Sequence, residues 1–287
     1  RIIAAMRRSI ADAGGEVLFG AKVTGVQIKD DRICGVWLGD TLVEGAAVIL
    51  AAGHSARDIY EILDRDGVRL EAKAFAMGVR AEHPQRLIDS IQYHMPERGE
   101  YLPAAAYSLV AQVGGRGVYS FCMCPGGYVV NASSEEGMLA VNGMSYQARD
   151  SHNANSAIIV TVNPSDFPEE GVLGGIALQR KLERAAWEAG KGKIPVQLFK
   201  DYCTHQKSTR LGDVIPCIKG AYTLTDVRSI FPKEIGDSIE AGIHAFGKKL
   251  SGFDRPDALL EGVESRTSSP VRIVREPKKL TSNIEGI

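Results

Sequence analysis

The sequence predicts an α/β protein with a mixed β/α region in its middle. Residues 1–70 show, in turn, the patterns of a helix, a hairpin, an apolar strand and a second helix. Residues 71–252 show short β-like runs broken by glycine pairs, together with two amphipathic helical patterns. Proline- or glycine-containing stretches near Glu71 and Gly252 are the candidate boundaries, which leave residues 253–287 as a third segment.

The first region supplies the α/β pattern. Apolar residues repeat at helical spacing over residues 3–13, and the glycines at 14–15 follow as a C-terminal stop. Asp30-Asp31 joins two short β-branched runs, which predicts a hairpin. The run "AAVILAAG" (46–53) is continuously apolar, as in a strand buried on both faces of a parallel sheet. A helix is expected next, from Arg57 to Asp66.

The middle region mixes strands and helices. "KAFAMGVRAEHP" (73–84) alternates apolar and polar residues and predicts a strand, and further short strands are expected between 101 and 162. Apolar spacing predicts a helix over 172–189, with four charged residues pointing outward: Arg180, Lys181, Glu183 and Arg184. Another helix is predicted between Pro232 and Gly252.

Composition excludes several classes of partner. The 287 residues carry 34 basic and 35 acidic side chains, so we expect no nucleic-acid partner on electrostatic grounds. No apolar run approaches the roughly 20 residues that span a bilayer, so we expect no membrane partner. The five cysteines lack framework spacing, which favours free thiols in a reducing compartment. We therefore expect a cytoplasmic protein.

The segment "VILAAGHSAR" (48–57) is a candidate ligand site. Ala51, Ala52 and Gly53 carry almost no side chain, so the backbone can approach a ligand closely, and His54 follows in a small-residue loop. The alternative is that many α/β domains end some strands in such residues. No glycine-rich dinucleotide fingerprint is present: "VGGRGVYS" (113–120) lacks the spacing and leads into a β-like run.

Cys122 and Cys124 admit three interpretations. They are metal ligands if Cys203 and His205 join them, but this spacing matches no common zinc motif, and we expect no metal site. They are redox thiols if their pKa is lowered, or else buried structural cysteines. The turn at Pro125, with Gly126 and Gly127 after it, favours lining of a site, because it brings backbone N–H groups near a flat or anionic ligand.

The segment "ESRTSSPVRIVREP" (264–277) places Arg266 beside three hydroxyl groups, among them Ser268. Hydroxyls beside an arginine suit the polar edge of a ligand. A capped turn with an exposed arginine is the alternative.

Both chain ends look interrupted, because the chain opens at Arg1 inside a helical pattern and stops at Ile287 without a terminal cap. We expect a piece of a longer polypeptide. The function of the piece and that of its parent are therefore separate questions.

Three segments together resemble a known family. "GGEVLFGAKVTGVQI…ICGVW…AAVILAAGHSARD", "SFCMCPGGYVVNASSEEGMLAVNGMSYQARDSHNANSAIIVTV" and "DALLEGVESRTSSPVRIVRE" resemble, in this order, bacterial FAD-dependent dehydrogenases of an uncharacterised class related to glutathione-reductase-type flavoproteins. The resemblance implies a discontinuous, Rossmann-like FAD-binding domain (1–70 and 253–287), present in part, with an inserted substrate domain (71–252). It also implies that both glycine-rich FAD segments lie outside this chain.

The resemblance assigns provisional roles. The backbone of Val23 would meet the adenine of FAD, residues 51–53 would lie under the cofactor, and residues 120–157 would face the flavin or substrate. We expect an FAD-dependent oxidoreductase in the parent, acting on a small organic substrate with a separate electron donor or acceptor. Whether the fragment itself is an enzyme stays open. The alternatives are a non-catalytic binding or assembly module that holds no FAD, and a flavoprotein acting on RNA.

Overall fold

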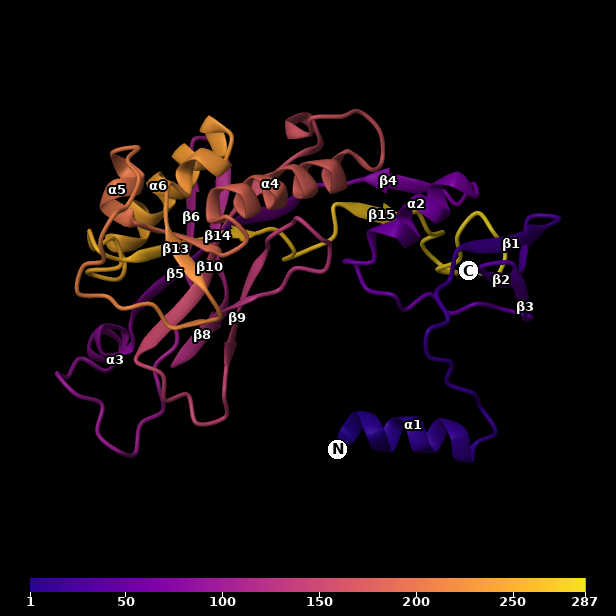
Figure 1. Cartoon of the computed structure of the whole chain (residues 1–287), viewed down its shortest axis with the longest axis horizontal. Helices are drawn as coiled ribbons and strands as arrows, with labels where there is room; N and C mark the ends of the chain where they lie inside the picture. Colours follow the sequence, from indigo (N-terminus) through magenta and orange to yellow (C-terminus); the bar gives the residue numbers. More distant parts are fainter. Residues whose placement is uncertain (287) are drawn as a thin grey trace. The chain divides into compact units, whose positions relative to one another are not determined.

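The computed structural model describes residues 1–286, which form two compact units (Figure 1). Unit 1 is Arg1–Glu71 with Arg272–Ile287, and unit 2 is Ala72–Val271. The chain crosses between them in strands β4 (Leu70–Ala72) and β15 (Val271–Ile273), which pair with each other. The boundary predicted near Gly252 differs from the second crossing, because β14 (Leu259–Glu264) belongs to the central sheet of unit 2.

Unit 1 contains two helices and a three-stranded antiparallel sheet: α1 (Ile2–Asp12), β1 (Gly25–Lys29), β2 (Arg32–Leu38), β3 (Thr41–Glu44) and α2 (Arg57–Arg65). The predicted hairpin is confirmed, and Asp30 and Asp31 turn it with φ angles of 52° and 58°. Such left-handed pairs match the twist of a two-residue hairpin. The two predicted helices are confirmed as well.

The predicted buried strand at 46–53 is wrong. No strand is present over these residues, and the Ile49 side chain is 93% exposed. A buried strand needs neighbours that bond its backbone on both sides. Within the described residues, the segment makes a single backbone contact of this kind, from the Val48 N–H to the Gly286 carbonyl. Residues 1–286 show a mixed α/β architecture with several sheets but no Rossmann fold.

Unit 2 is built on a seven-stranded mixed sheet. Its strands, in spatial order, are β13 (Tyr222–Leu224), β11 (Ile194–Leu198), β14, β5 (Phe75–Pro84), β10 (Asn153–Val162), β7 (Arg116–Cys124) and β6 (Val110–Val113). β11 and β13 run parallel, and the other neighbours are antiparallel. The strands predicted at 73–84 and in 101–162 are thereby confirmed.

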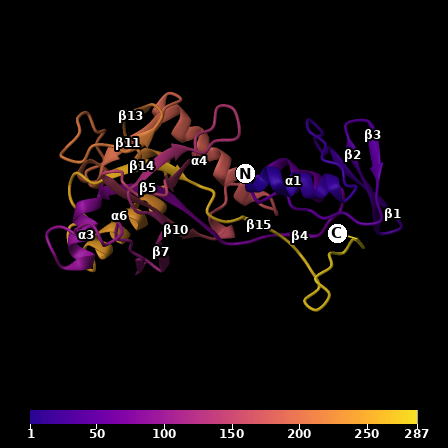
Figure 2. The same ribbon diagram turned by 90° about the horizontal axis from the view of Figure 1, so that it is seen from below.

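The two faces of this sheet are covered by different layers. Helix α6 (Lys233–Gly247) packs on one face, where a Cβ added at Gly242 would lie 2.5 Å from Val118 Cγ1 (Figure 2). The small sheet of β12 (Ile218–Lys219), β8 (Gly127–Asn131) and β9 (Val141–Ser145) packs on the other. There, a Cβ added at Gly143 would lie 2.2 Å from Arg80 Nη2.

Strand β5 shows why the two faces differ. Met77 and Val79 are fully buried on the α6 face, whereas Arg80 and Glu82 point the opposite way and are also fully buried. Successive residues of a strand point to opposite faces, so the alternation separates an apolar layer from a polar one. The sequence predicts this alternation. The polar residues of β5 are buried as well, because the small sheet covers their face.

The remaining elements of unit 2 are short helices and α4. They are α3 (Gln85–Tyr93), η1 (Pro164–Asp166), α4 (Gly174–Gly190), α5 (Phe199–Cys203) and η2 (Arg228–Ile230). The predicted helices at α4 and α6 are confirmed. The outward orientation predicted for Glu183 is wrong, because its side chain is 0% exposed and bonded to Arg266. Within residues 1–286, no helix is long and apolar enough to cross a membrane.

Candidate functional site

A buried arginine organises the polar layer between the two sheets of unit 2. Arg80 is 0% exposed, its Nε donates to Asn155 Oδ1 at 2.8 Å, and its Nη1 lies 3.2 Å from Glu264 Oε2. These residues come from β5, β10 and β14, which are adjacent in the sheet. A charge taken out of water needs partners of this kind, because burial without them costs several kcal/mol or more.

Arg80 also holds the cysteine segment. Its Nη2 donates to the Cys122 carbonyl and lies 3.4 Å from Cys124 Sγ. Cys122 has a φ of 44°, in the left-handed region that residues other than glycine seldom adopt. Cys122 is exposed and Cys124 is half-buried, so two thiols lie at the edge of a rigid polar layer.

The glycine turn after Cys124 is closely packed. Gly126 has a φ of 46°, and a Cβ there would lie 1.9 Å from the Arg149 carbonyl oxygen. Its N–H donates to Gln85 Oε1 at 2.7 Å, and Gly127 pairs with Ser145 between β8 and β9. The Gly126 N–H that the sequence offers to a ligand is therefore bonded within the protein.

A pair of buried acids lies next to Arg80 in the same layer. Glu82 and Glu261 are both fully buried, and their carboxyl groups are hydrogen-bonded to each other. Burial, followed by the nearby Glu82, raises the pKa of Glu261 well above its usual range. Burial also raises the pKa of Glu82, although hydrogen bonds from Asn153 and the Cys217 backbone oppose the shift. Burial of this kind favours the protonated form of a carboxyl.

A third cysteine borders the acid pair. Cys217 is buried, its N–H lies 3.0 Å from both oxygens of Glu82, and its Sγ lies 3.2 Å from His152 Nε2. Burial raises the pKa of the Cys217 thiol, while the hydrogen bond from Ser151 opposes the shift. This contact is a cysteine–histidine pair with a protonated thiol at neutral pH.

The charge of Arg80 does not activate Cys122. Partial burial of the thiol raises the pKa of Cys122, and Arg80 only opposes this shift. A nucleophilic or redox thiol needs a lowered pKa. The geometry therefore suits a cysteine that lines a site better than one that attacks a substrate.

Arg266 and Ser268 follow β14 at another position in unit 2. Arg266 Nη2 lies 2.9 Å from Glu183 Oε2, and its Nη1 donates to Ser134 Oγ. The Arg266 side chain is 12% exposed, so most of its polar surface is already used. Ser268 is half-buried in the loop that follows.

The other predicted binding residues lie in unit 1. Val23 is half-buried just before β1, while Ala51, Ala52 and Gly53 are exposed. Ala52, Gly53 and His54 line a cavity of about 220 Å³, whose wall is completed by Leu50, Ile59, Tyr60 and Ile273. An adjoining cavity of about 430 Å³ shares three of these residues and adds Val48, Ile49, Arg272, Arg275, Leu280 and Ser282.

The structure groups the predicted residues by unit. Within unit 1, Ala52, Gly53 and His54 share a cavity, whereas Ala51 does not line it. Within unit 2, Cys122 and Cys124 share Arg80 as a contact, whereas Arg266 bonds instead to Glu183 on α4. Sequence reasoning missed Arg80, Glu82 and Glu261, because alternating charged residues in a strand ordinarily face water. The sequence feature that could have identified them is the presence of an arginine and two glutamates within strand patterns whose other residues are apolar.

Comparison with known proteins places unit 2 in a family. Residues 74–267 match the family described as "FAD-dependent protein, C-terminal domain-like". The chain belongs to this family. The matched segment contains the Arg80 layer, both cysteines of the 120–127 segment, and Arg266.

The chain is also similar to a protein of Clostridium beijerinckii (strain ATCC 51743 / NCIMB 8052). This uncharacterised protein is 44% identical over 290 residues, which cover 100% of the present chain and 54% of the relative. The chain thus spans about half the length of the relative that it matches.

Proposed function

We propose that the chain is part of an FAD-dependent oxidoreductase, in which hydride or electrons pass between flavin and a small organic substrate. Membership of an FAD-dependent protein family supports the cofactor. The Cys122–Gly127 segment is the proposed position of the flavin ring. It offers thiols and uncharged backbone groups, which the contacts with Arg80 hold in place. Such groups suit an isoalloxazine ring, since few exposed charges have to be desolvated when it binds.

Unit 1 fits part of a dinucleotide. Its two adjoining cavities, of about 220 and 430 Å³, combine small residues at 52–53, the ring of Tyr60, and the side chains of Arg272 and Arg275. Arg272 is paired with Glu71, whereas Arg275 forms no ion pair with another side chain among residues 1–286. A guanidinium beside apolar walls suits a phosphate with an aromatic base attached. We assign this region as the part of a Rossmann-like FAD domain that the chain supplies, with Val23 near the adenine.

When bound, FAD supplies the redox chemistry, and the chain's own residues position the reactants and keep water out. Cys122 and Cys124 line the reaction site, while Arg80 holds their backbone in place. Glu82 and Glu261, whose pKa values burial raises, lie behind this segment as a buried support. The electron donor or acceptor is a separate molecule.

Flavin retention by the purified chain tests the assignment. The chain is incubated with excess FAD and desalted, and its visible absorption is recorded before and after. Retained flavin bands, weakened in Arg275→Ala but not in the matched surface variant Arg8→Ala, are the expected result. A protein that stays colourless and quenches no flavin fluorescence at any FAD concentration favours a non-catalytic module instead.

The role of the thiols has its own test. In the flavin-loaded protein, Cys122→Ser with Cys124→Ser is expected to shift the flavin absorption bands, because the polarity next to the ring changes. Cys34→Ser in unit 1 is the matched control. Identical spectra and reduction behaviour in the double variant and the wild type would remove both cysteines from the flavin site.

A further inference from the structure

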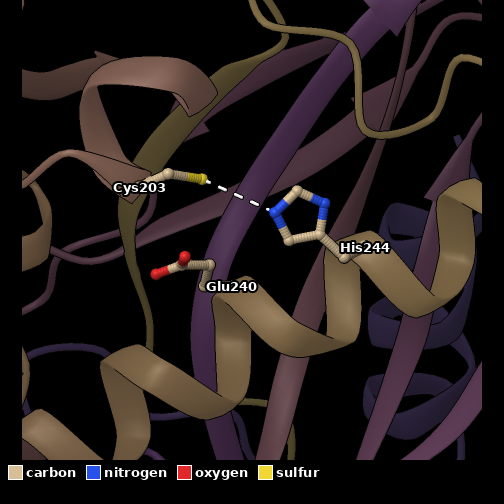
Figure 3. Close-up of side chains that lie close together, drawn as sticks. All are labelled: Cys203, Glu240 and His244. Atoms are coloured by element: carbon tan, nitrogen blue, oxygen red, sulfur yellow. Dashed lines mark hydrogen bonds between the residues drawn. The ribbon is translucent and has the colours of Figure 1, made fainter.

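A second cluster of chemically reactive side chains lies in unit 2, between α5 and α6. Cys203 is the last residue of α5, and Glu240 and His244 stand four residues apart on α6. Residues four apart on a helix occupy the same face. One ligand atom from each of the three residues lies within 4.8 Å of the other two (Figure 3).

The histidine is oriented by a carboxylate. His244 Nδ1 lies 3.2 Å from Asp254 Oδ2, and the opposite nitrogen, Nε2, points at Cys203 Sγ at 3.9 Å. A proton shared between Nδ1 and Asp254 leaves the lone pair on Nε2, which faces the sulfur. Metal-binding histidines characteristically use their second nitrogen in this way, to fix the tautomer and the ring orientation.

We propose that Cys203, Glu240 and His244 bind one Zn²⁺ ion. Thiolate, imidazole and carboxylate together suit zinc, and three protein ligands leave one position for water or another ligand. Zinc–sulfur and zinc–nitrogen bonds of about 2.3 and 2.05 Å in a tetrahedral site place the two ligand atoms about 3.6 Å apart. The observed 3.9 Å between Cys203 and His244 differs from this by a few tenths of an ångström.

The charges around the cluster suit a divalent cation. Arg228 Nη1 donates to Glu240 Oε2 at 2.5 Å, which fixes one oxygen and leaves Oε1 for a metal. Asp254 adds a second carboxylate behind the imidazole, and Asp237 takes the other arm of Arg228. The imidazole edge also packs against Phe199, with ring centroids 5.0 Å apart, which limits its rotation.

The site is open to solvent on one side. Cys203 and Glu240 are half-buried, and the His244 side chain is 50% exposed. An ion can therefore enter without unfolding of the protein. The contact between Cys217 and His152 differs in this respect, because Cys217 is buried and both ends of the contact are bonded to other groups.

Cobalt titration of the 287-residue chain tests the proposal. Co²⁺ is added to the reduced, metal-free protein while the visible and near-ultraviolet absorption is recorded. One equivalent is expected to produce a cobalt–thiolate charge-transfer band together with the intense visible bands of a tetrahedral site. Zn²⁺ is expected to displace the cobalt and bleach both sets of bands.

Variants locate the site. Cys203→Ser is expected to abolish the charge-transfer band, and His244→Gln to weaken Zn²⁺ binding at least about 100-fold. Asp254→Asn, which changes only the orienting partner, is expected to weaken binding about 10- to 100-fold. Cys217→Ser is the matched control and is expected to bind like the wild type. Circular dichroism monitors folding, and His244→Gln decides the matter if Cys203→Ser fails to fold.

Three results would overturn the zinc site. They are the absence of a thiolate band in the wild type, its persistence in Cys203→Ser or His244→Gln, and its loss in Cys217→Ser. The last would assign the metal to the buried cysteine–histidine contact instead.

Discussion

Arg80 Nη1 and Glu264 Oε2 lie 3.2 Å apart in unit 2, with side chains that are 0% and 4% exposed. The pair joins β5 to β14 beneath the small sheet, and Arg80 extends it to Asn155 and to the Cys122 carbonyl. Arg80 therefore couples the stability of the central sheet to the conformation of the cysteine segment.

Removal of Arg80 alone is expected to be costly. Arg80→Met leaves the Glu264 carboxyl buried without its partner, and loss of one member of such a pair typically costs about 3–5 kcal/mol. Urea unfolding of the two proteins measures the difference. The double variant Arg80→Met with Glu264→Gln is expected to recover part of this loss, because no unpaired acid remains. Additive effects of the two changes would contradict the coupling.

The buried acid pair is expected to make the protein less stable as the pH rises. Glu261 has a folded-state pKa well above the 4.5 of a free glutamate, so the folded protein keeps a proton that the unfolded chain releases. Below about pH 4.5 both states hold the proton, and the contribution of Glu261 to the free energy of unfolding does not change with pH. Above it, stability falls by up to about 1.4 kcal/mol per pH unit until the folded-state pKa is reached.

Glu261→Gln removes the contribution of Glu261 to this pH dependence and is expected to stabilise the protein at pH 8 relative to the wild type. Denaturant unfolding at several pH values compares the two, and Glu188→Gln on the exposed face of α4 is the matched control. Parallel stability curves for the wild type and Glu261→Gln would show that the Glu261 carboxyl is not held protonated.

His83 is expected to have the opposite effect. Its ring is 1% exposed, and burial lowers its pKa from 6.5 to about 4, while Nε2 lies 2.6 Å from the Phe253 carbonyl. The unfolded chain takes up a proton near pH 6.5 and the folded protein only near pH 4. Stability is therefore lost as the pH falls through this window, by about 3 kcal/mol in total.

His83→Gln keeps a donor for the Phe253 carbonyl and removes the titration. Its stability is expected to change less than that of the wild type between pH 6.5 and 4. His94→Asn, at an exposed left-handed position that asparagine tolerates, is the control. An equal acid response in the wild type and His83→Gln would contradict a neutral, buried His83.

Much of the fold could be predicted from local pattern. The hairpin follows from Asp30-Asp31, the strand β5 from its alternation, and the helix α6 from its apolar spacing. Each of these signals lies within the element itself, so all three elements could be predicted. The strand expected at 46–53 failed, because a continuous apolar run records a preference for burial but not the presence of pairing partners. The Ile49 side chain is instead exposed in the described part of the chain.

The candidate site was less predictable, because it depends on contacts that are long-range in sequence. Cys122 and Cys124 attracted attention through unusual spacing, whereas Arg80 is joined to them only by the sheet. His244 lies within a predicted helix, and helical spacing alone does not mark it as a ligand. Its approach to Cys203 follows from the packing of α5 against α6, which no short motif encodes.

Glu183 tests how far helical periodicity can mislead. Periodicity places this residue outward, yet its Oε1 accepts from Ser265 Oγ at 2.5 Å and its Oε2 lies 2.9 Å from Arg266 Nη2. Glu183→Gln removes the charge from a buried, bidentate pair and leaves Arg266 without a counterion. We expect a loss of about 3–5 kcal/mol in the free energy of unfolding.

The same substitution at exposed Glu188, nearby on α4, is expected to change stability by less than about 0.5 kcal/mol. Thermal and urea unfolding of the two variants measure the contrast. Equal effects at the two positions would mean that Arg266 finds another partner, and that it is available to a ligand as the sequence first suggested.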